Sequence, residues 1–192
     1  MLAGLAVRMR ERGFDVVVTR EPGGTALGNR LREVFKAPDL AIEPLAEAML
    51  VNASRAQHVD ELIEPALAAG RWILCDRFAA ATLAYQGYGR GVPLETLRGL
   101  ADLATRGRRP DLTLLIDVPV DVSRRRVAER ARQTAEAEDR LERESGEFHA
   151  RVRDGYLELA RDDRSFVMLD GRLAPEALCK LAWRAVVTRF TL

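Results

Sequence analysis

Four short apolar runs, each separated from the next by a longer stretch with helical spacing, constrain the fold of this chain most. The runs are Val16–Val18, Trp72–Cys75, Leu112–Val118 and Phe166–Leu169. Strands that alternate with helices predict an α/β fold with a mostly parallel sheet, in which ligands bind at the carboxyl ends of the strands. The third run is almost continuously apolar, as expected for a strand that helices cover on both faces.

Apolar residues at helical spacing predict the elements between these runs. The predicted helical stretches are 1–12, 28–35, 44–70 with a break near 58–60, 83–85, 94–106, a charged region at 120–160, and a terminal helix from 175. A glycine-rich turn is predicted at Gly87–Gly91. Because the 192 residues contain no repeat and no linker, we predict one domain that spans residues 1–192.

The composition excludes several classes of protein. Thirty basic and twenty-nine acidic residues leave a net charge of +1, so neither nucleic acid nor a membrane is an expected partner. No apolar run approaches the ~20 residues that span a bilayer, and the opening MLAGLAV lacks the features of a secretory signal. Cys75 and Cys179 have no metal-site or redox-pair spacing, which favours reduced core cysteines. A cytoplasmic protein is expected.

The segment TREPGGT, residues 19–25, follows the first predicted strand at its carboxyl end. Pro22 biases Glu21 towards an extended conformation, and the glycine pair allows backbone angles and a close ligand approach that other residues forbid. An isolated motif of this kind is most often an ordinary strand-to-helix turn. The motif becomes informative because a second polar motif follows the next strand.

Asp76 and Arg77 come directly after the second predicted strand. A carboxylate there can hold hydrated Mg²⁺ and an arginine can bind phosphoryl oxygens, although a structural ion pair is equally compatible. On the following helical turn, Thr82 is spaced i, i+3 from Tyr85 and i, i+4 from Gln86, so all three can face one ligand. A hydroxyl, a phenol and an amide suit recognition of a base and a sugar.

Arginines elsewhere are candidates for phosphate or base contacts. Arg32 and Arg55 lie on predicted helices, where a guanidinium can clamp a phosphate or a base carbonyl, but such arginines are usually only solvated. Residues 123–143 are dense in charge, which is typical of a solvated helical face. The alternative is a mobile lid at about 123–146 whose arginines neutralise a transferring phosphate. The candidates are Arg130, Arg132 and Arg140.

Together, five segments resemble bacterial thymidylate kinases in the family's order and over nearly the whole chain. They are TREPGGT, EAMLVNASRAQH, CDRF with TLAYQGYGRG, RPDLTLLIDV, and DRLE before GEFHARVRDGYLELA. The resemblance implies a P-loop NTPase-like three-layer fold and a homodimer. It also implies transfer of the γ-phosphate of ATP to dTMP, with Mg²⁺, to give dTDP for dTTP biosynthesis. The expected partners are dTMP and ATP.

The resemblance also implies roles for single residues in catalysis. Asp76 would lie beside the transferring phosphate as the acidic catalytic residue and a magnesium ligand, with Glu21 near the same ion and the acceptor. The arginines of the lid would stabilise charge that spreads over the γ-phosphoryl oxygens.

Further implied roles concern the acceptor nucleotide. Arg32 and Arg77 would hold its phosphate, and Arg77 would also belong to the catalytic group. The residues implied around the base and sugar are Arg55, Thr82, Tyr85 and Gln86. Of these, the arginine and the amide would contact thymine.

Three positions depart from the family pattern. Val51 stands where members commonly have an aromatic residue on thymine, which would forfeit ~1–3 kcal/mol of stacking. Ala80 and Ala81 stand where members tend to carry an acidic residue and a hydroxyl, and the lid is several residues longer. These differences leave open a kinase for another nucleoside monophosphate.

Residues 1–192 contain no GxxxxGK[ST] phosphate-binding loop. That loop holds the ATP phosphates, and positioning with charge neutralisation is nearly the whole of phosphoryl-transfer catalysis. We therefore expect the chain to lack the family's first strand and P-loop and to be nearly inactive alone. A truncated chain that starts at an internal methionine is the expected cause. The alternative is a non-catalytic kinase-like paralogue that binds a nucleotide or a partner.

Overall fold

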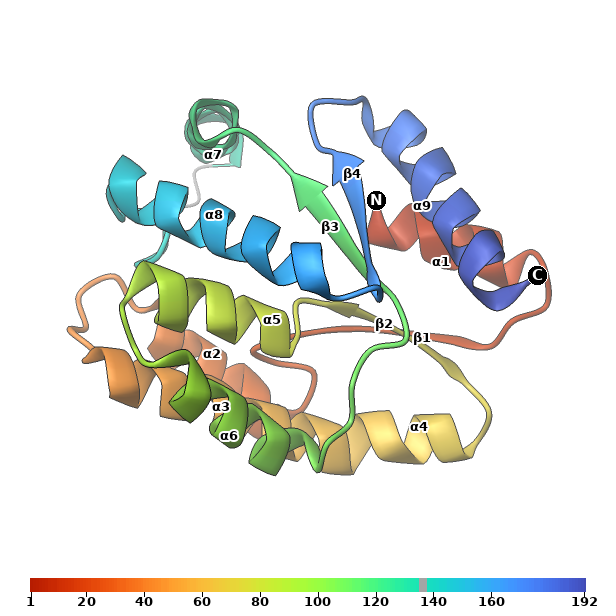
Figure 1. The fold of residues 1–192 in the computed structure, drawn as a ribbon, viewed down its shortest axis with the longest axis horizontal. Helices are drawn as coiled ribbons and strands as arrows, with labels where there is room; N and C mark the ends of the chain where they lie inside the picture. Colours follow the sequence, from red (N-terminus) through yellow and green to blue (C-terminus); the bar gives the residue numbers. More distant parts are fainter. Residues whose placement is uncertain (135–137) are drawn as a thin grey trace.

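The computed structural model describes residues 1–134 and 138–192, in which strands alternate with helices along the chain (Figure 1). The strands are β1 (Val16–Arg20), β2 (Trp72–Asp76), β3 (Thr113–Asp117) and β4 (Phe166–Asp170). All four lie where the apolar runs predict them. The α-helices are α1 (Leu2–Arg10), α2 (Ala26–Lys36), α3 (Pro44–His58), α4 (Glu64–Ala68), α5 (Ala79–Thr82), α6 (Leu94–Thr105), α7 (Val120–Thr134), α8 (Gly146–Asp162) and α9 (Pro175–Phe190).

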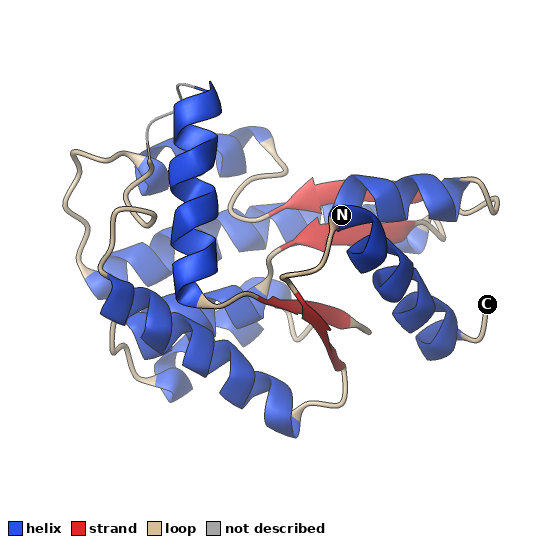
Figure 2. Cartoon of the chain, turned by 90° about the horizontal axis from the view of Figure 1, so that it is seen from above, coloured by secondary structure: helices blue, strands red, loops and turns tan. Residues whose placement is uncertain are grey.

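The strands form two separate parallel pairs rather than one continuous sheet. β1 pairs with β2, and β3 pairs with β4, as the view from above shows (Figure 2). The register of the first pair sets Arg20 beside Asp76, so the two polar motifs leave neighbouring strand ends. The α/β class with parallel strands is therefore confirmed, whereas the prediction of a single sheet is wrong for the described residues, because no hydrogen bonds join the pairs.

The largest apolar cluster lies between α1, α9 and the strands. Leu5 and Met9 of α1 are buried against Val16 of β1 and Leu169 of β4. Trp72 adds edge-to-face ring contacts, with ring centroids 5.4 Å from that of Phe14 and 4.8 Å from that of Phe190. This core joins both strand pairs through the two terminal helices.

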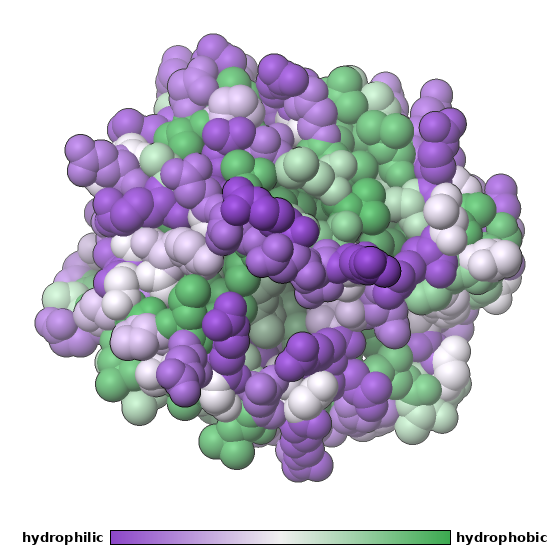
Figure 3. All heavy atoms as spheres, viewed as in Figure 1, coloured by the Kyte–Doolittle hydropathy of each residue, from purple (hydrophilic) through white to green (hydrophobic). Residues whose placement is uncertain are grey.

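The strand residues themselves are less buried than their sequence suggests. Every residue of β3 is half-buried, and Met168 of β4 is 58 % exposed. Apolar side chains accordingly gather at the surface around β3 and β4 in the space-filling view (Figure 3). An interior parallel strand is normally covered on both faces, so this exposure is unusual for such apolar sequences.

The predicted break in the long helix 44–70 is confirmed as a π-helical segment, η1 (Val59–Ile63), between α3 and α4. A second π-helical segment, η2 (Leu83–Gly89), continues α5. The turn predicted at Gly87–Gly91 is therefore wrong for most of its length. A Cβ at Gly89 would lie 2.7 Å from the Phe148 ring, so this glycine serves close helix packing rather than a turn.

The predicted lid, about 123–146, comprises most of α7 and the segment that leads to α8. Its residues 135–137 lie outside the described residues. Ser145 begins α8 as its N-cap, and its Oγ accepts a hydrogen bond from the N–H of Phe148 at 3.1 Å. Among the helices of the described residues, none is long and apolar enough to cross a membrane.

Candidate functional site

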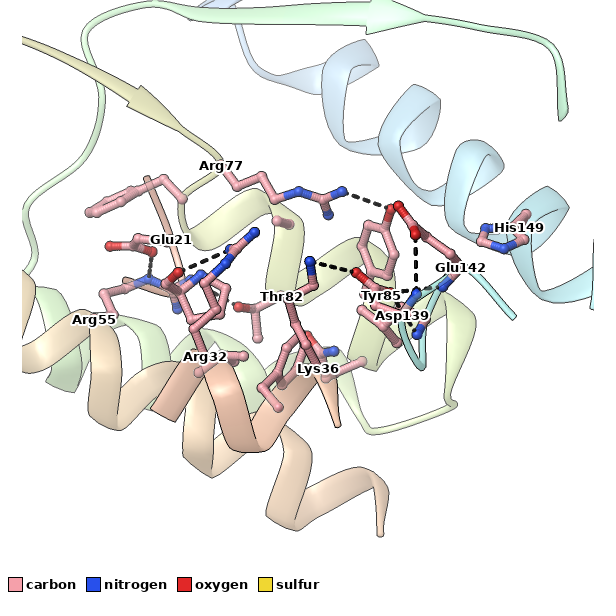
Figure 4. Close-up of a pocket in the computed structure, with 17 residues that line it drawn as sticks. Glu21, Arg32, Lys36, Arg55, Arg77, Thr82, Tyr85, Asp139, Glu142 and His149 are labelled. Carbon is pink, nitrogen blue, oxygen red and sulfur yellow. Dashed lines mark hydrogen bonds and ion pairs between the residues drawn. The ribbon is translucent and has the colours of Figure 1, made fainter. Parts of the chain in front are cut away.

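A pocket lies where the turns after β1 and β2 meet helices α2, α3 and η2 and the segment before α8 (Figure 4). All seven residues predicted to bind the acceptor line it. They are Glu21, Arg32, Arg55, Arg77, Thr82, Tyr85 and Gln86. The sequence positions are far apart, and the topology of β1 and β2 brings them together.

Glu21 and Arg55 form a buried ion pair at the base of the pocket (Figure 4). The Nε atom of Arg55 donates to Oε2 of Glu21 at 2.7 Å, and the two side chains are 2 % and 3 % exposed. The guanidinium also donates to Oδ1 of Asn52 at 2.7 Å and to Oγ1 of Thr82 at 3.0 Å. Buried charges require such partners, and these bonds hold the arginine in one orientation.

Positive charge converges on one wall of the pocket. Burial lowers the pKa of Arg32, and the nearby cations Arg20 and Arg77 lower it further. Its Nη1 donates to the backbone oxygen of Pro22 at 3.1 Å, which fixes the head group without neutralising it. Mutually repelling guanidinium groups in a cleft favour a bound anion.

Arg77 adopts a strained backbone conformation as the chain leaves β2. Its φ is 68°, in the left-handed region that non-glycine residues seldom occupy. The guanidinium carbon lies 4.7 Å from the centroid of the Tyr85 ring, and Nη2 donates to the Tyr85 hydroxyl at 3.2 Å. Strain of this kind is concentrated at functional sites, and here it aims the side chain towards the pocket (Figure 4).

A second buried network lies beside the pocket and is centred on Glu47, a carboxylate with no exposed surface. Gln86 donates to its Oε1 at 2.6 Å. Its Oε2 pairs with Nη1 of Arg140 at 2.6 Å and with Nη2 of Arg90 at 3.5 Å. The carboxylate of Glu47 therefore orients the Gln86 amide, which is predicted to contact the base. The sequence analysis did not identify Glu47.

The three lid arginines do not line the pocket. Arg140 is bound to Glu47 and to the backbone oxygen of Phe35. Arg130 donates to both carboxylate oxygens of Glu142, a pocket residue, at 2.8 and 2.9 Å, and Arg132 donates to the backbone oxygen of Ala128. In this arrangement Arg130 and Arg140 brace the segment that closes one side of the pocket, whereas Arg132 bonds only within α7 among the described residues.

The two carboxylates predicted for Mg²⁺ differ in their surroundings. Asp76 ends β2 and is exposed to solvent, which suits an ion that keeps most of its water ligands. Glu21 instead binds Arg55 through Oε2 and His58 through Oε1, so both oxygens already have donors. No cluster of three or more His, Cys, Asp or Glu that could hold a metal occurs among the described residues.

Several pocket residues escaped the sequence analysis. Phe35 and Lys36 follow Arg32 at i+3 and i+4 on α2, a helical spacing that could have revealed them. Phe78 follows Arg77, and its aromatic ring lines the pocket together with that of Phe35. The pocket therefore has aromatic walls even though Val51, which also lines it, offers no ring.

Residues from the second half of the chain complete the pocket. They are Asp139, Leu141, Glu142 and His149. Lys36 pairs with Asp139 at 3.1 Å and ties this side to α2 (Figure 4). Burial lowers the pKa of His149, the dominant effect on that group. No sequence pattern could have revealed these contacts, because they depend on how the segment before α8 folds back over α2.

A family model and several similar proteins give the same family. The family model described as thymidylate kinase matches residues 2–180. The thymidylate kinase of Carboxydothermus hydrogenoformans is 49 % identical over 174 residues, which cover 91 % of this chain and 83 % of that protein. The thymidylate kinase of Deinococcus radiodurans is 46 % identical over 189 residues, which cover 98 % and 89 %.

A third relative, the thymidylate kinase of Geotalea uraniireducens, is 49 % identical over 170 residues, which cover 87 % of this chain and 80 % of that protein. The match extends from α1 into α9 and includes every element that lines the pocket. The chain therefore belongs to the thymidylate kinase family, the dTMP kinases among the nucleoside monophosphate kinases.

Proposed function

We propose that this chain binds dTMP in the pocket beside the ends of β1 and β2, as the acceptor site of a thymidylate kinase. The reaction is the transfer of the γ-phosphoryl group of ATP to dTMP. The observation that carries the proposal is the convergence of all seven expected acceptor residues on a single pocket with a cationic wall. Membership of the family supplies the reaction.

Two parts of the pocket suit two parts of the nucleotide. Arg32 and Arg77 would hold the 5′-phosphate, because Arg32 bonds a backbone oxygen and Arg77 a phenol hydroxyl, and these neutral partners leave the guanidinium charges available to an anion. Arg55, Thr82 and Gln86 would surround the base, and Tyr85 would lie next to the sugar. The rings of the pocket would supply the base contact that Val51 cannot.

The residues also fit a magnesium ion, with Asp76 as its protein ligand. Mg²⁺ commonly takes one or two carboxylates, several waters and the phosphates of the substrate. When bound, the ion would neutralise charge on the nucleotide phosphates. We assign Glu21 a different role, since its two oxygens hold Arg55 and His58.

We infer that residues 1–192 by themselves transfer phosphate very slowly. They contain no GxxxxGK[ST] sequence to cradle the phosphates of ATP. The split between the two strand pairs and the half-buried apolar residues of β2 and β3 are consistent with one missing interior strand. Phosphoryl transfer depends on positioning, so an incomplete donor site would reduce the rate severely.

Residues 1–192 would form one domain with a lid at about 123–146, and the family resemblance favours a cytoplasmic homodimer. The described lid residues support a closing role, because Asp139 and Arg140 both contact elements of the acceptor side.

Calorimetric titration tests the acceptor site directly. The chain is expected to bind dTMP and to prefer it to dCMP, dAMP and dGMP. Binding of another monophosphate without binding of dTMP would overturn the substrate assignment. A coupled assay of ADP release tests the second inference, and ordinary turnover by residues 1–192 alone would refute it.

A further inference from the structure

His58 is a fully buried histidine whose two ring nitrogens both have partners. Its Nδ1 lies 3.0 Å from Oε1 of Glu21, and its Nε2 lies 2.7 Å from Oγ1 of Thr19. A carboxylate only accepts hydrogen bonds, so the tautomer with its proton on Nδ1 satisfies Glu21 and leaves Nε2 to accept from the Thr19 hydroxyl. For the neutral imidazole, the network thereby assigns a direction to each bond.

His58 and Arg55 hold the same carboxylate from one face of α3. They are spaced i, i+3, and each binds a different oxygen of Glu21, at 3.0 and 2.7 Å. A carboxylate held at both oxygens cannot rotate about its last bond. Glu21 therefore presents a fixed acceptor to Nε of Arg55.

The turn after β1 packs directly onto the His58 ring. A Cβ at Gly24 would lie 2.6 Å from Cδ2 of His58 and 2.6 Å from Oγ1 of Thr19, and φ of Gly24 is 82°. The N–H of Gly23 also donates to Oγ of Ser54, another residue of α3, at 3.1 Å. The imidazole thus joins the end of β1, its turn and α3 at one point.

Arg55 keeps hydrogen-bonding capacity for a ligand after these contacts are made. Among the described residues, Glu21, Asn52 and Thr82 use three of its N–H groups, and a guanidinium has about five in total. The remaining donors suit a carbonyl acceptor on a base. An arginine can donate to the C4 carbonyl of thymine but cannot accept from the C4 amino group of cytosine.

We propose that His58 is a positioning residue for base recognition: it fixes Glu21, and Glu21 fixes the guanidinium of Arg55 at the base end of the pocket. This role rests on the proposed dTMP site. His58 does not line the pocket, so its effect on the ligand passes through Glu21 and Arg55, which do.

The test compares dTMP and dCMP binding by calorimetry in His58→Leu, His58→Gln and the unaltered chain. One lost hydrogen bond of this type corresponds to roughly tenfold in affinity. His58→Leu is expected to weaken dTMP binding about tenfold and dCMP binding by less than about twofold. His58→Gln, which can still donate to Glu21, is expected to stay within about threefold of the unaltered chain. Equal weakening of both nucleotides would show a merely structural role and overturn the proposal.

Two further variants guard against a folding defect. Thr19→Val keeps the branched shape but removes the hydroxyl that binds Nε2, and about threefold weakening of dTMP alone is expected. Gln57→Leu is the matched control, because Gln57 precedes His58 on α3 and bonds the exposed Glu61. No change is expected for Gln57→Leu, and an equal loss there would count against the proposal.

Hydrogen exchange of the Arg55 Nε–H, followed by NMR without ligand, separates this proposal from the dTMP assignment. Faster exchange, by about tenfold, is expected in His58→Leu but not in His58→Gln. Unchanged exchange in His58→Leu would refute the positioning role. If the unaltered chain does not bind dTMP, the proposed function fails, while this measurement still decides whether His58 fixes Arg55.

Discussion

Glu47 and Arg140 form an ion pair in which the carboxylate has no exposed surface and the guanidinium side chain is 11 % exposed, with Oε2 and Nη1 2.6 Å apart. The pair connects α3 to the segment before α8, and Lys36 and Asp139 connect α2 to the same segment. The acceptor pocket is thus closed on one side by two contacts between charged groups. Of the two, the Glu47–Arg140 pair is the buried one, and removing one partner of a buried pair leaves an uncompensated charge.

Removing the Glu47 charge is expected to destabilise the fold. In Glu47→Gln, Arg140 would be left buried without its carboxylate, whereas Arg90 would keep its ion pair with Glu144 at 2.6 Å, so the free energy of unfolding should fall by about 3 kcal/mol. Urea denaturation measures the change. Glu158→Gln, which breaks an exposed i, i+3 pair with Arg161, serves as the control and should leave the midpoint in place. Equal midpoints for all three proteins would contradict the importance of the buried pair.

Replacement of Arg32 is expected to impair phosphate binding selectively. Hydrogen bonds to a charged group contribute about 1.5–3 kcal/mol, so Arg32→Gln should weaken dTMP binding by roughly 10–100-fold. Arg30→Gln on the same helix removes only an exposed pair with Glu33 and should bind dTMP normally. Calorimetry of the two variants measures their affinities for dTMP. Similar affinities would show that Arg32 does not bind the phosphate.

Substitutions at Gly24 and Gly91 distinguish the effect of backbone strain on stability from the effect of close packing. Their φ angles are 82° and 81°, but a Cβ at Gly91 meets nothing within 4 Å, whereas one at Gly24 collides with His58 and Thr19. Gly91→Ala should cost ~1–2 kcal/mol of stability from its left-handed backbone. Gly24→Ala should cost that amount plus ~1–3 kcal/mol of overpacking and should weaken dTMP binding. Equal stability losses in urea denaturation would show that the contact with His58 is unimportant.

We predict that a glycine-to-alanine substitution within a helix has opposite effects on stability at Gly99 and Gly155. Gly99 lies on α6 with open space around its Cβ position, so Gly99→Ala should stabilise the protein by ~0.5–1 kcal/mol through helix propensity. A Cβ at Gly155 of α8 would lie 2.5 Å from Cγ of Tyr88, so Gly155→Ala should lower stability by ~1–3 kcal/mol. Thermal unfolding distinguishes the two, and a stabilised Gly155→Ala would contradict the packing of α8 on η2.

We predict that Asp139 contributes to the stability of the fold and that this contribution is lost in acid. Burial raises the pKa of Asp139, but the N–H of Glu142, the Lys36 ammonium and the N–H of Leu141 outweigh burial and hold the pKa below its usual value. A depressed folded pKa gives stability that is present above the unfolded pKa of about 3.9 and is lost as the pH falls through the folded value. The urea midpoints of Asp139→Asn and the unaltered chain should therefore differ at pH 7 and converge towards pH 2. A difference between the two urea midpoints that grows as the pH falls would contradict a lowered pKa of Asp139.

The sequence was sufficient for the strands and for the positions of the two polar motifs at strand ends, because both depend on local signals. Apolar runs predicted all four strands, and TREPGGT and DRF were expected at strand ends, which parallel pairing brings together. The break near His58 was also predictable, since helical patterning falters there. These features lie within short segments whose residues determine their own conformation.

Contacts between distant segments could not be predicted in this way. In the sequence, nothing distinguishes Glu47 from other charged helical residues, because its buried partners Gln86 and Arg140 approach from other elements. The glycines at 87–91 suggested a turn because composition alone does not distinguish flexibility from close packing. No local pattern marks His58 as part of the site, since its partners Thr19 and Glu21 are near it only in the folded chain.

The π-helical segment η1 shifts the helical phase between α3 and α4. One additional residue in a helical turn rotates everything after it by about 100° relative to an uninterrupted α-helix. Before η1, the inward face carries Arg55 and His58 of the site; after it, Ala66 faces the core. Deletion of Asp60 alone would restore a uniform helix and put these two faces out of alignment. A single-residue length change at this point therefore determines whether one helix can serve both a binding site and a core.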